Sequence, residues 1–122
     1  MIPKKMLEVL KHEGVVAIVN QGSKVHVVNT WNSYIEISKD GNLLVPVGRM
    51  QTSEKNIDEN NKILVTMGSR EVEGFHSMGT GFLIEARGEV LYQGEDYIFM
   101  KEKFPWIRAV LRLKPEGISQ TL

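Results

Sequence analysis

Short apolar stretches, many of them rich in β-branched residues, recur along the chain and are separated by polar or glycine-containing turns. This pattern is typical of β-strands in an antiparallel sheet. A turn around Gly22 and another at Asp40–Gly41 each join two such stretches, so we expect tight connections there. The stretches predicted as strands are Val15–Val19, Val25–Val28, Tyr34–Ile37, Leu43–Val47, Lys62–Met67, Phe82–Leu91 and Ala109–Leu113.

Apolar residues at spacings of three and four positions predict short helices near both ends of the chain. The first begins at Pro3, which suits the first turn of a helix, and ends before Gly14. Its expected apolar face consists of Met6, Leu7 and Leu10. The other helix must stop before Pro105. Its expected apolar residues are Tyr97, Met100 and Phe104.

Polar and glycine-rich segments complete the predicted layout. Thr52 or Ser53 can cap a short polar helix that runs to about Glu59. The stretch Gly68–Gly81 contains four glycines among charged residues, so we expect an exposed connection there. Gly117–Leu122 is expected to be a tail that follows the last strand.

Pro46 bears on how the sheet ends. Proline has no N–H to donate to a neighbouring strand, so the Leu43–Val47 strand should be an edge strand or be bulged at Pro46. The strands are not separated by regular helices, as they would be in a doubly wound parallel sheet. The layout therefore favours a mainly β protein, an antiparallel barrel of six or so strands with two or three short helices.

Composition narrows the function classes. With 122 residues, the chain has the size of one domain, 1–122. Fifteen acidic residues balance 15 basic ones, so no net charge favours nucleic acid or an anionic membrane. Cysteine is absent, which excludes disulfides and thiol nucleophiles. The charged N-terminal segment and the lack of a long apolar run favour a cytoplasmic protein with no membrane partner.

The first candidate binding segment lies between two predicted strands. It combines two aromatic residues with four small polar ones: Asn29, Thr30, Trp31, Asn32, Ser33 and Tyr34. Aromatic side chains can cover a flat heteroaromatic ligand while amides and hydroxyls meet its polar rim. The alternative is that Trp31 and Tyr34 belong to the barrel core and the polar residues only form a turn, because most aromatic residues serve packing.

The second candidate segment follows the Pro46 strand and opens a helix: Gly48, Arg49, Met50, Gln51, Thr52, Ser53, Glu54 and Lys55. Backbone N–H groups at a helix N-terminus, two hydroxyls and the cations Arg49 and Lys55 are suited to a phosphate group. The alternative is an ordinary helix cap that binds nothing, which is the commoner use of such residues.

Other chemistry has little support in the sequence. His12, His26 and His76 lack metal-ligand spacing, so no metal site is expected. Gly79-Thr80-Gly81 lacks the six-residue spacing of a dinucleotide fingerprint and precedes a strand. No nucleophile with a neighbouring base can be assembled from the spacing, so we assign no catalytic residue.

The candidate segments belong to a longer resemblance. From end to end, the chain resembles the family of small FMN-binding proteins of sulfate-reducing bacteria, which are minimal members of the FMN-binding split-barrel superfamily. That superfamily also includes pyridoxamine 5′-phosphate oxidase and flavin reductases. The stretches that carry the resemblance are Glu8–Lys11, Glu13–Ile18, Val28–Tyr34, Val45–Gly48, Gly68–Arg70, Gly79–Ile84 and Gln120–Leu122.

The resemblance implies a six-stranded antiparallel split barrel with Greek-key connectivity, and a homodimer that holds FMN without a covalent bond near the subunit interface. The residues implied in FMN binding are Asn29, Thr30, Trp31, Asn32, Tyr34, Val47, Gly48, Arg49, Met50, Gln51, Thr52, Ser53, Trp106 and Leu122. Among these, Leu122 matches a residue that reaches the flavin from the partner subunit. Trp31, Tyr34 and Trp106 match aromatic residues close to the flavin ring.

One departure from the family concerns the phosphate. The family has a lysine directly before the phosphate-binding hydroxyl, where this chain has Thr52 before Ser53. A family glycine is replaced by Arg49. We expect Arg49, or secondarily Lys55, to supply the positive charge that a phosphate dianion requires.

Three functions remain open at this point. The resemblance and the short chain favour an electron carrier that exchanges electrons with an unknown redox partner protein. The alternative is an enzyme, a flavin reductase or a small-substrate oxidase, which uses NAD(P)H or a pyridoxamine-like substrate. A third possibility is a module that only stores FMN or another heterocycle such as haem.

Overall fold

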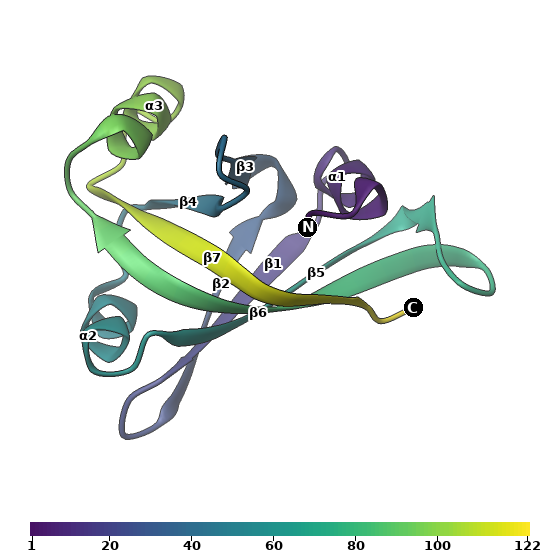
Figure 1. The fold of residues 1–122 in the computed structure, drawn as a ribbon, viewed down its shortest axis with the longest axis horizontal. Helices are drawn as coiled ribbons and strands as arrows, with labels where there is room; N and C mark the ends of the chain where they lie inside the picture. The colour runs from purple at the N-terminus through teal and green to yellow at the C-terminus, as the bar shows by residue number, and fades with distance from the viewer.

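The computed structural model describes residues 1–122, and it is organised by one antiparallel sheet of seven strands in the order β2-β1-β5-β6-β7-β4-β3 (Figure 1). The strands are β1 (Val15–Gln21), β2 (Val25–Trp31), β3 (Glu36–Ile37), β4 (Leu43–Val47), β5 (Lys62–Glu73), β6 (Met78–Leu91) and β7 (Ala109–Gln120). The helices are α1 (Lys4–Leu10), α2 (Gln51–Glu59), α3 (Glu95–Lys103) and the single-turn 3-10 helix η1 (Asn32–Tyr34). None of them has the length and apolar character that a bilayer crossing requires.

The sheet curls around one main core. Ile18 of β1, Val45 of β4 and Leu111 of β7 belong to the same cluster of 19 buried apolar residues, although β1 and β4 lie four strands apart in the sheet order. The edge strands β2 and β3 are not paired with each other, so the barrel stays open between them. This arrangement confirms the predicted class, a mainly β split barrel, with seven strands in place of six.

Two helices close the core and the third packs outside it (Figure 1). Met6 and Val9 of α1 are fully buried in the main cluster, and Ile57 of α2 joins it from another side. On α3, Met100 and Phe104 belong to a second, smaller cluster with residues of β4 and β7. The predicted helix before Pro105 is confirmed by α3, which ends at Lys103.

The predicted exposed connection Gly68–Gly81 is wrong. Most of it belongs to β5 and β6, which form a long projecting hairpin (Figure 1). A Cβ atom at Gly68 would lie 2.9 Å from the Thr80 carbonyl oxygen, so glycine there permits a close approach of two strands. The predicted tail Gly117–Leu122 is also wrong, because β7 pairs with β6 as far as Gln120. In both places the pairing of distant strands decides the structure.

Three further expectations need correction. The predicted strand Tyr34–Ile37 is mostly replaced by η1, which leaves only Glu36–Ile37 as β3. In α1, Val9 rather than Leu7 shares the buried face with Met6, as spacing i, i+3 allows. Neither predicted cap operates on α2, because Met50 occupies the N-cap position and makes no side-chain capping bond.

The expectation for Pro46 is confirmed. Along its whole length β4 pairs with β7, but it pairs with β3 only at Leu43 and Leu44. The other side of Pro46 therefore faces no strand, and the missing N–H breaks no ladder there. This free edge leads directly to the Gly48–Met50 segment.

Candidate functional site

The end of β2 presents the first predicted segment. Side chains alternate along this edge strand, so Asn29 and Trp31 face outward and are exposed, while Thr30 is half-buried on the inner side. Trp31 is 46% exposed, so the alternative that it belongs to the barrel core is wrong. Its indole is available to another molecule.

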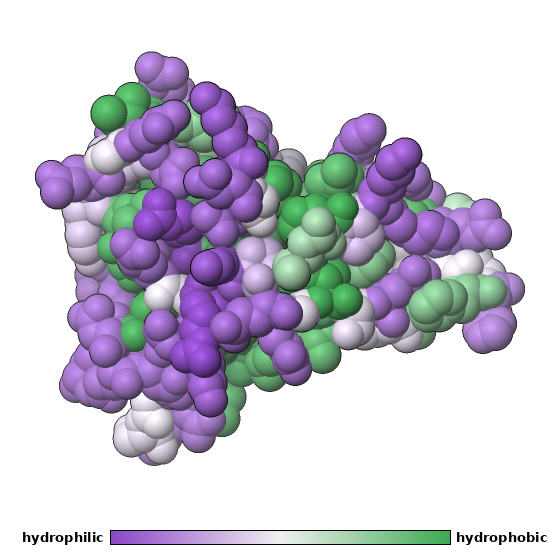
Figure 2. Space-filling model, in the orientation of Figure 1, coloured by the Kyte–Doolittle hydropathy of each residue, from purple (hydrophilic) through white to green (hydrophobic).

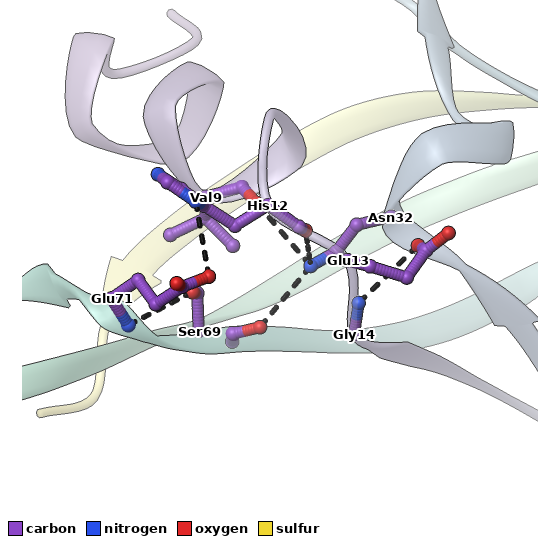
Figure 3. Close-up of polar contacts among 8 residues, drawn as sticks. Val9, His12, Glu13, Gly14, Asn32, Ser69 and Glu71 are labelled. Carbon is purple, nitrogen blue, oxygen red and sulfur yellow. Dashed lines mark hydrogen bonds and ion pairs between the residues drawn. The ribbon is translucent and has the colours of Figure 1, made fainter.

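Asn32 has a different environment from its neighbours, because its side chain is fully buried (Figure 3). Its Nδ2 donates to the carbonyl oxygens of Val9 at 3.3 Å, His12 at 2.9 Å and Gly68 at 3.2 Å. These carbonyls belong to α1, to the turn after it and to β5. One amide thereby fixes the position of the β2–η1 junction. The Asn32 Oδ1 is buried and has no hydrogen-bond partner.

Glu13 holds the same junction from the solvent side. Its carboxylate accepts hydrogen bonds from the Ser33 hydroxyl at 2.7 Å, the Ser33 N–H at 3.3 Å and the Gly14 N–H at 3.3 Å. The bonds from Ser33, led by the hydroxyl, lower the pKa of Glu13, so the carboxylate stays charged at neutral pH. A negative charge therefore lies one residue from Asn32.

Three aromatic rings form a cluster next to the second predicted segment. The Tyr34 ring centroid lies 5.2 Å from that of Phe104 and 5.8 Å from that of Trp106, and the last two are 5.9 Å apart. Phe104 is buried but Trp106 is 52% exposed. A Cβ atom at Gly48 would lie 3.4 Å from the Trp106 ring. The cluster thus brings three predicted residues together, Tyr34, Gly48 and Trp106.

The N-terminus of α2 has free hydrogen-bond donors. The first N–H groups of any helix have no partner within it, and α2 has no side-chain cap to satisfy them. Gln51 and Thr52, in its first turn, are exposed, and Arg49 just before the helix is exposed and makes no hydrogen bond or ion pair. Uncapped donors and an unpaired cation together favour an anion at this point.

Ser53 lies in the same turn but points inward. It is 1% exposed, and its Oγ accepts a hydrogen bond from Asn20 Nδ2 at 3.2 Å. Asn20 Oδ1 in turn accepts one from Asn56 Nδ2 at 2.8 Å. This buried polar chain anchors α2 to β1. The Ser53 side chain is therefore engaged in the interior, whereas the Thr52 side chain faces solvent.

Arg108 is a residue of this region that the sequence analysis missed. It directly precedes β7, and its Nε donates to the Gly48 carbonyl oxygen at 3.1 Å. Its guanidinium also pairs with the Glu54 carboxylate, which accepts a second hydrogen bond from the Tyr92 hydroxyl at 2.6 Å. The cluster joins α2 to the start of β7. No sequence signal marks it, because its members lie 38 and 54 residues apart.

Charge pairing shifts the pKa values of this cluster. Burial alone would raise the pKa of Glu54, but the hydrogen bonds from Arg108 and Tyr92 together with the positive charge of Arg108 outweigh it, so the pKa is lowered. The hydrogen bond to Glu54 raises the pKa of Tyr92. Glu54 and Arg108 are therefore both charged at neutral pH. The Arg108 charge is neutralised by Glu54, whereas Arg49 keeps its charge free.

Leu122 lies far from Trp106 along β7. It follows β7, and twelve strand residues span roughly 35 Å between the Trp106 end and the Leu122 end. None of three surface hollows of about 330 to 460 Å³ is lined by a predicted FMN residue. One chain alone therefore does not enclose the predicted set.

The chemistry of these residues fits FMN. Tyr34, Trp106 and the exposed Trp31 offer aromatic surface to a flat ring. Arg49 and the uncapped N-terminus of α2 offer a cation and N–H donors to a phosphate. FMN is a flat ring joined to a phosphate, so both of its ends find matching groups.

Comparisons with known proteins agree with this fit. The chain is 42% identical, over 100% of both chains, to the "FMN-binding protein" of Nitratidesulfovibrio vulgaris. No family model matches it. Among solved structures, HupZ of Group A Streptococcus has a TM-score of 0.81 at 16% identity and matches 99% of this chain and 100% of its own. A putative pyridoxamine 5′-phosphate oxidase of Lactobacillus delbrueckii has a TM-score of 0.71 at 13% identity, over 97% and 93%.

The two kinds of similarity carry different weight. The solved structures share little sequence with this chain, so they show the fold alone, the split barrel already described. The Nitratidesulfovibrio protein matches along its entire length at an identity that shows common descent. The chain therefore belongs to the family of small FMN-binding proteins with the split-barrel fold.

Proposed function

We propose that this chain is a non-covalent FMN-binding protein that works as a homodimeric electron carrier. The observation that carries the proposal is the aromatic cluster of Tyr34, Phe104 and Trp106, which lies against Gly48 beside the uncapped N-terminus of α2. When bound, FMN supplies the redox chemistry, and the chain has no cysteine that could carry out thiol redox chemistry beside it.

Each end of the site has its own task. Arg49, Thr52 and the first N–H groups of α2 bind the phosphate, and the helix dipole adds to their attraction. Trp31, Tyr34 and Trp106 pack against the flavin ring and exclude water from it. The buried Asn32 and Ser53 side chains position these groups from the interior.

The Gly48–Met50 segment contributes main-chain groups. Glycine at 48 leaves the backbone accessible beside the Trp106 ring. Arg108 fixes the Gly48 carbonyl, so the neighbouring N–H groups have a defined direction. Fixed donors next to the ring edge stabilise negative charge there, and this is how the chain would raise the reduction potential of its flavin.

An apolar outer face of the sheet supports the homodimer. The exposed residues of this face are Val15, Val25, Val27, Trp31 and Leu64. The strand register places Val27 beside Val19 and Val19 beside Leu64, so the apolar side chains form a continuous row across three strands. From the side drawn in Figure 2, on which β6 and β7 lie in front, apolar surface is visible in the middle of the molecule between more hydrophilic regions. A second copy of the chain would cover such a face.

The carrier and the enzyme can be separated by one experiment. The FMN-loaded protein is mixed with NADH or NADPH without oxygen, and the loss of the flavin absorbance is followed. If the protein is a carrier that depends on a partner protein, its flavin should be bleached slowly, because we identify no segment of this chain that would bind NADH or NADPH. Rapid stoichiometric bleaching would show that the protein is a flavin reductase.

A further inference from the structure

We propose that Tyr92 and Arg108 neutralise and immobilise the Glu54 carboxylate, and that the chain thereby prefers a flavin with a phosphate over one without it. The inference rests on the proposed function, since it requires that the phosphate of FMN binds at the start of α2. Tyr92 and Arg108 are assigned as positioning residues. They act on the choice of ligand through Glu54 rather than by contact with the phosphate.

Glu54 carries the one negative charge in the first turn of α2. Its N–H donates to the Met50 carbonyl oxygen at 2.8 Å, whereas the N–H groups of Gln51 and Thr52 have no partner within the helix. About 4.5 Å of helix axis separates Glu54 from Gln51, the first residue of α2. An uncompensated carboxylate at this point would repel a phosphate that these N–H groups bind.

Two donors from distant parts of the chain hold the Glu54 carboxylate. One of its oxygens accepts a hydrogen bond from the Tyr92 hydroxyl at 2.6 Å, and the other pairs with the Arg108 guanidinium. Because each oxygen has its own donor, the side chain is held in one orientation. The Glu54 side chain is only 13% exposed, so water screens its charge less than at an exposed position. The two donors therefore decide how much of this charge the phosphate meets.

The protonation states agree with this arrangement. Burial would raise the pKa of Glu54, but the hydrogen bonds from Arg108 and Tyr92 and the charge of Arg108 lower it overall. The hydrogen bond to Glu54 raises the pKa of Tyr92, so its hydroxyl keeps the proton that it donates. The Glu54 charge is thus offset by a cation rather than removed by protonation.

Arg108 also connects Glu54 to the segment that precedes α2. Its Nε donates to the Gly48 carbonyl oxygen at 3.1 Å while its guanidinium pairs with Glu54. Arg49, the next residue after Gly48, is exposed and makes no ion pair. With Arg108 in place, Glu54 has a cation of its own and Arg49 is left for the phosphate. Without Arg108, the Glu54 carboxylate would compete with the phosphate for Arg49.

The first test compares FMN with riboflavin, which lacks the phosphate, in Tyr92→Phe. This change removes one hydroxyl and keeps the ring. The Kd for FMN should rise about threefold, because a hydrogen bond to a charged group is lost, while the Kd for riboflavin should change less than about 1.5-fold. Tyr97→Phe is the matched control, because it removes a hydroxyl on α3 that has no part in the cluster, and it should change neither Kd. Equal changes for both ligands in Tyr92→Phe, or no change for either, would overturn the proposal.

The second test asks whether the charge of Glu54 is the cause. Glu54→Gln, which keeps the shape of the side chain without its charge, is added to Arg108→Ala. The double variant should bind FMN about threefold more tightly than Arg108→Ala alone, and this gain should shrink at high salt, which screens charges. A double variant that binds FMN no better than Arg108→Ala would mean that Arg108 acts only on the Gly48 backbone, and the proposal would be wrong.

These results also separate the inference from the proposed function. A wild-type protein that binds FMN and riboflavin equally tightly, or whose Tyr92→Phe variant affects both ligands alike, rejects the role of the Glu54 cluster and leaves FMN binding intact. A wild-type protein that does not bind FMN rejects both.

Discussion

Arg108 and Gly48 are joined by a hydrogen bond of 3.1 Å between the arginine Nε and the glycine carbonyl oxygen. This contact links the start of β7 to the segment that we propose binds the flavin. Glycine has little conformational preference of its own. The backbone at residue 48 therefore depends on contacts such as the Arg108 hydrogen bond to hold one conformation.

Replacement of Arg108 by alanine should therefore weaken FMN binding. The Gly48 carbonyl loses its donor and Glu54 loses its cation, so the Gly48–Met50 segment becomes more mobile. FMN binding then has to order this segment, which costs conformational entropy. We expect the Kd for FMN to rise about fivefold, a modest effect because the Arg108 side chain is 44% exposed to water. The measurement is a fluorescence titration of the apoprotein with FMN.

The matched control for this change is Arg87→Ala. Both arginines have 44% exposed side chains and each pairs with a glutamate, but Arg87 pairs with Glu116 on β7, away from the predicted site. Its removal should leave FMN affinity unchanged. Equal effects of the two substitutions would contradict a specific role for Arg108.

Arg49 is predicted to recognise the phosphate rather than the ring. Arg49→Ala should weaken FMN binding about tenfold and leave binding of riboflavin, which has no phosphate, almost unchanged. Titrations with the two ligands give the comparison directly. If Lys55→Ala has this phosphate-dependent effect and Arg49→Ala does not, Lys55 is the compensating cation.

The buried chain Asn20–Ser53–Asn56 should stabilise the fold. Asn20→Ala leaves the buried Asn56 amide without its acceptor, at a cost of about 2 kcal/mol in the free energy of unfolding. Urea denaturation measures it. Asn61→Ala, which removes an exposed amide that accepts a bond from Arg87, should cost less than about 0.5 kcal/mol.

Glu54 should make stability depend on acid pH. Its pKa is lowered in the folded protein, so its contribution is fully present above the ordinary glutamate pKa of about 4.3 and is lost as the pH falls through the lowered value. Wild type should therefore lose stability relative to Glu54→Gln over this acidic range. The measurement is the free energy of unfolding of both proteins from about pH 3 to 7. Two curves that stay parallel over this range would contradict a stabilising role for the Glu54–Arg108 pair.

The sequence predicted the parts of the fold that depend on local pattern. The hairpin turn at Gly22, the free edge at Pro46 and the end of α3 before Pro105 are each set by the conformational limits of one residue or a short turn. The Gly68–Gly81 error has the opposite cause. Its glycines allow strands to approach each other, but in the sequence they are indistinguishable from loop glycines.

The candidate site was predictable to a similar extent. The resemblance indicated Tyr34, Gly48 and Trp106, and the structure brings these three together. It could not indicate that Ser53 points inward, because a helix side chain's direction depends on where the helix packs. Arg108 was missed for a related reason. Its partners are distant in the sequence and meet only when α2 and β7 are both in place.

The central claim is that two chains together hold one FMN per subunit, and sedimentation of the protein during an FMN titration tests it most directly. Absorbance at the flavin band and at the protein band is recorded for each sedimenting species. The account predicts a dimer that carries flavin at one FMN per chain. A protein that remains monomeric at high concentration and sediments without flavin would contradict it.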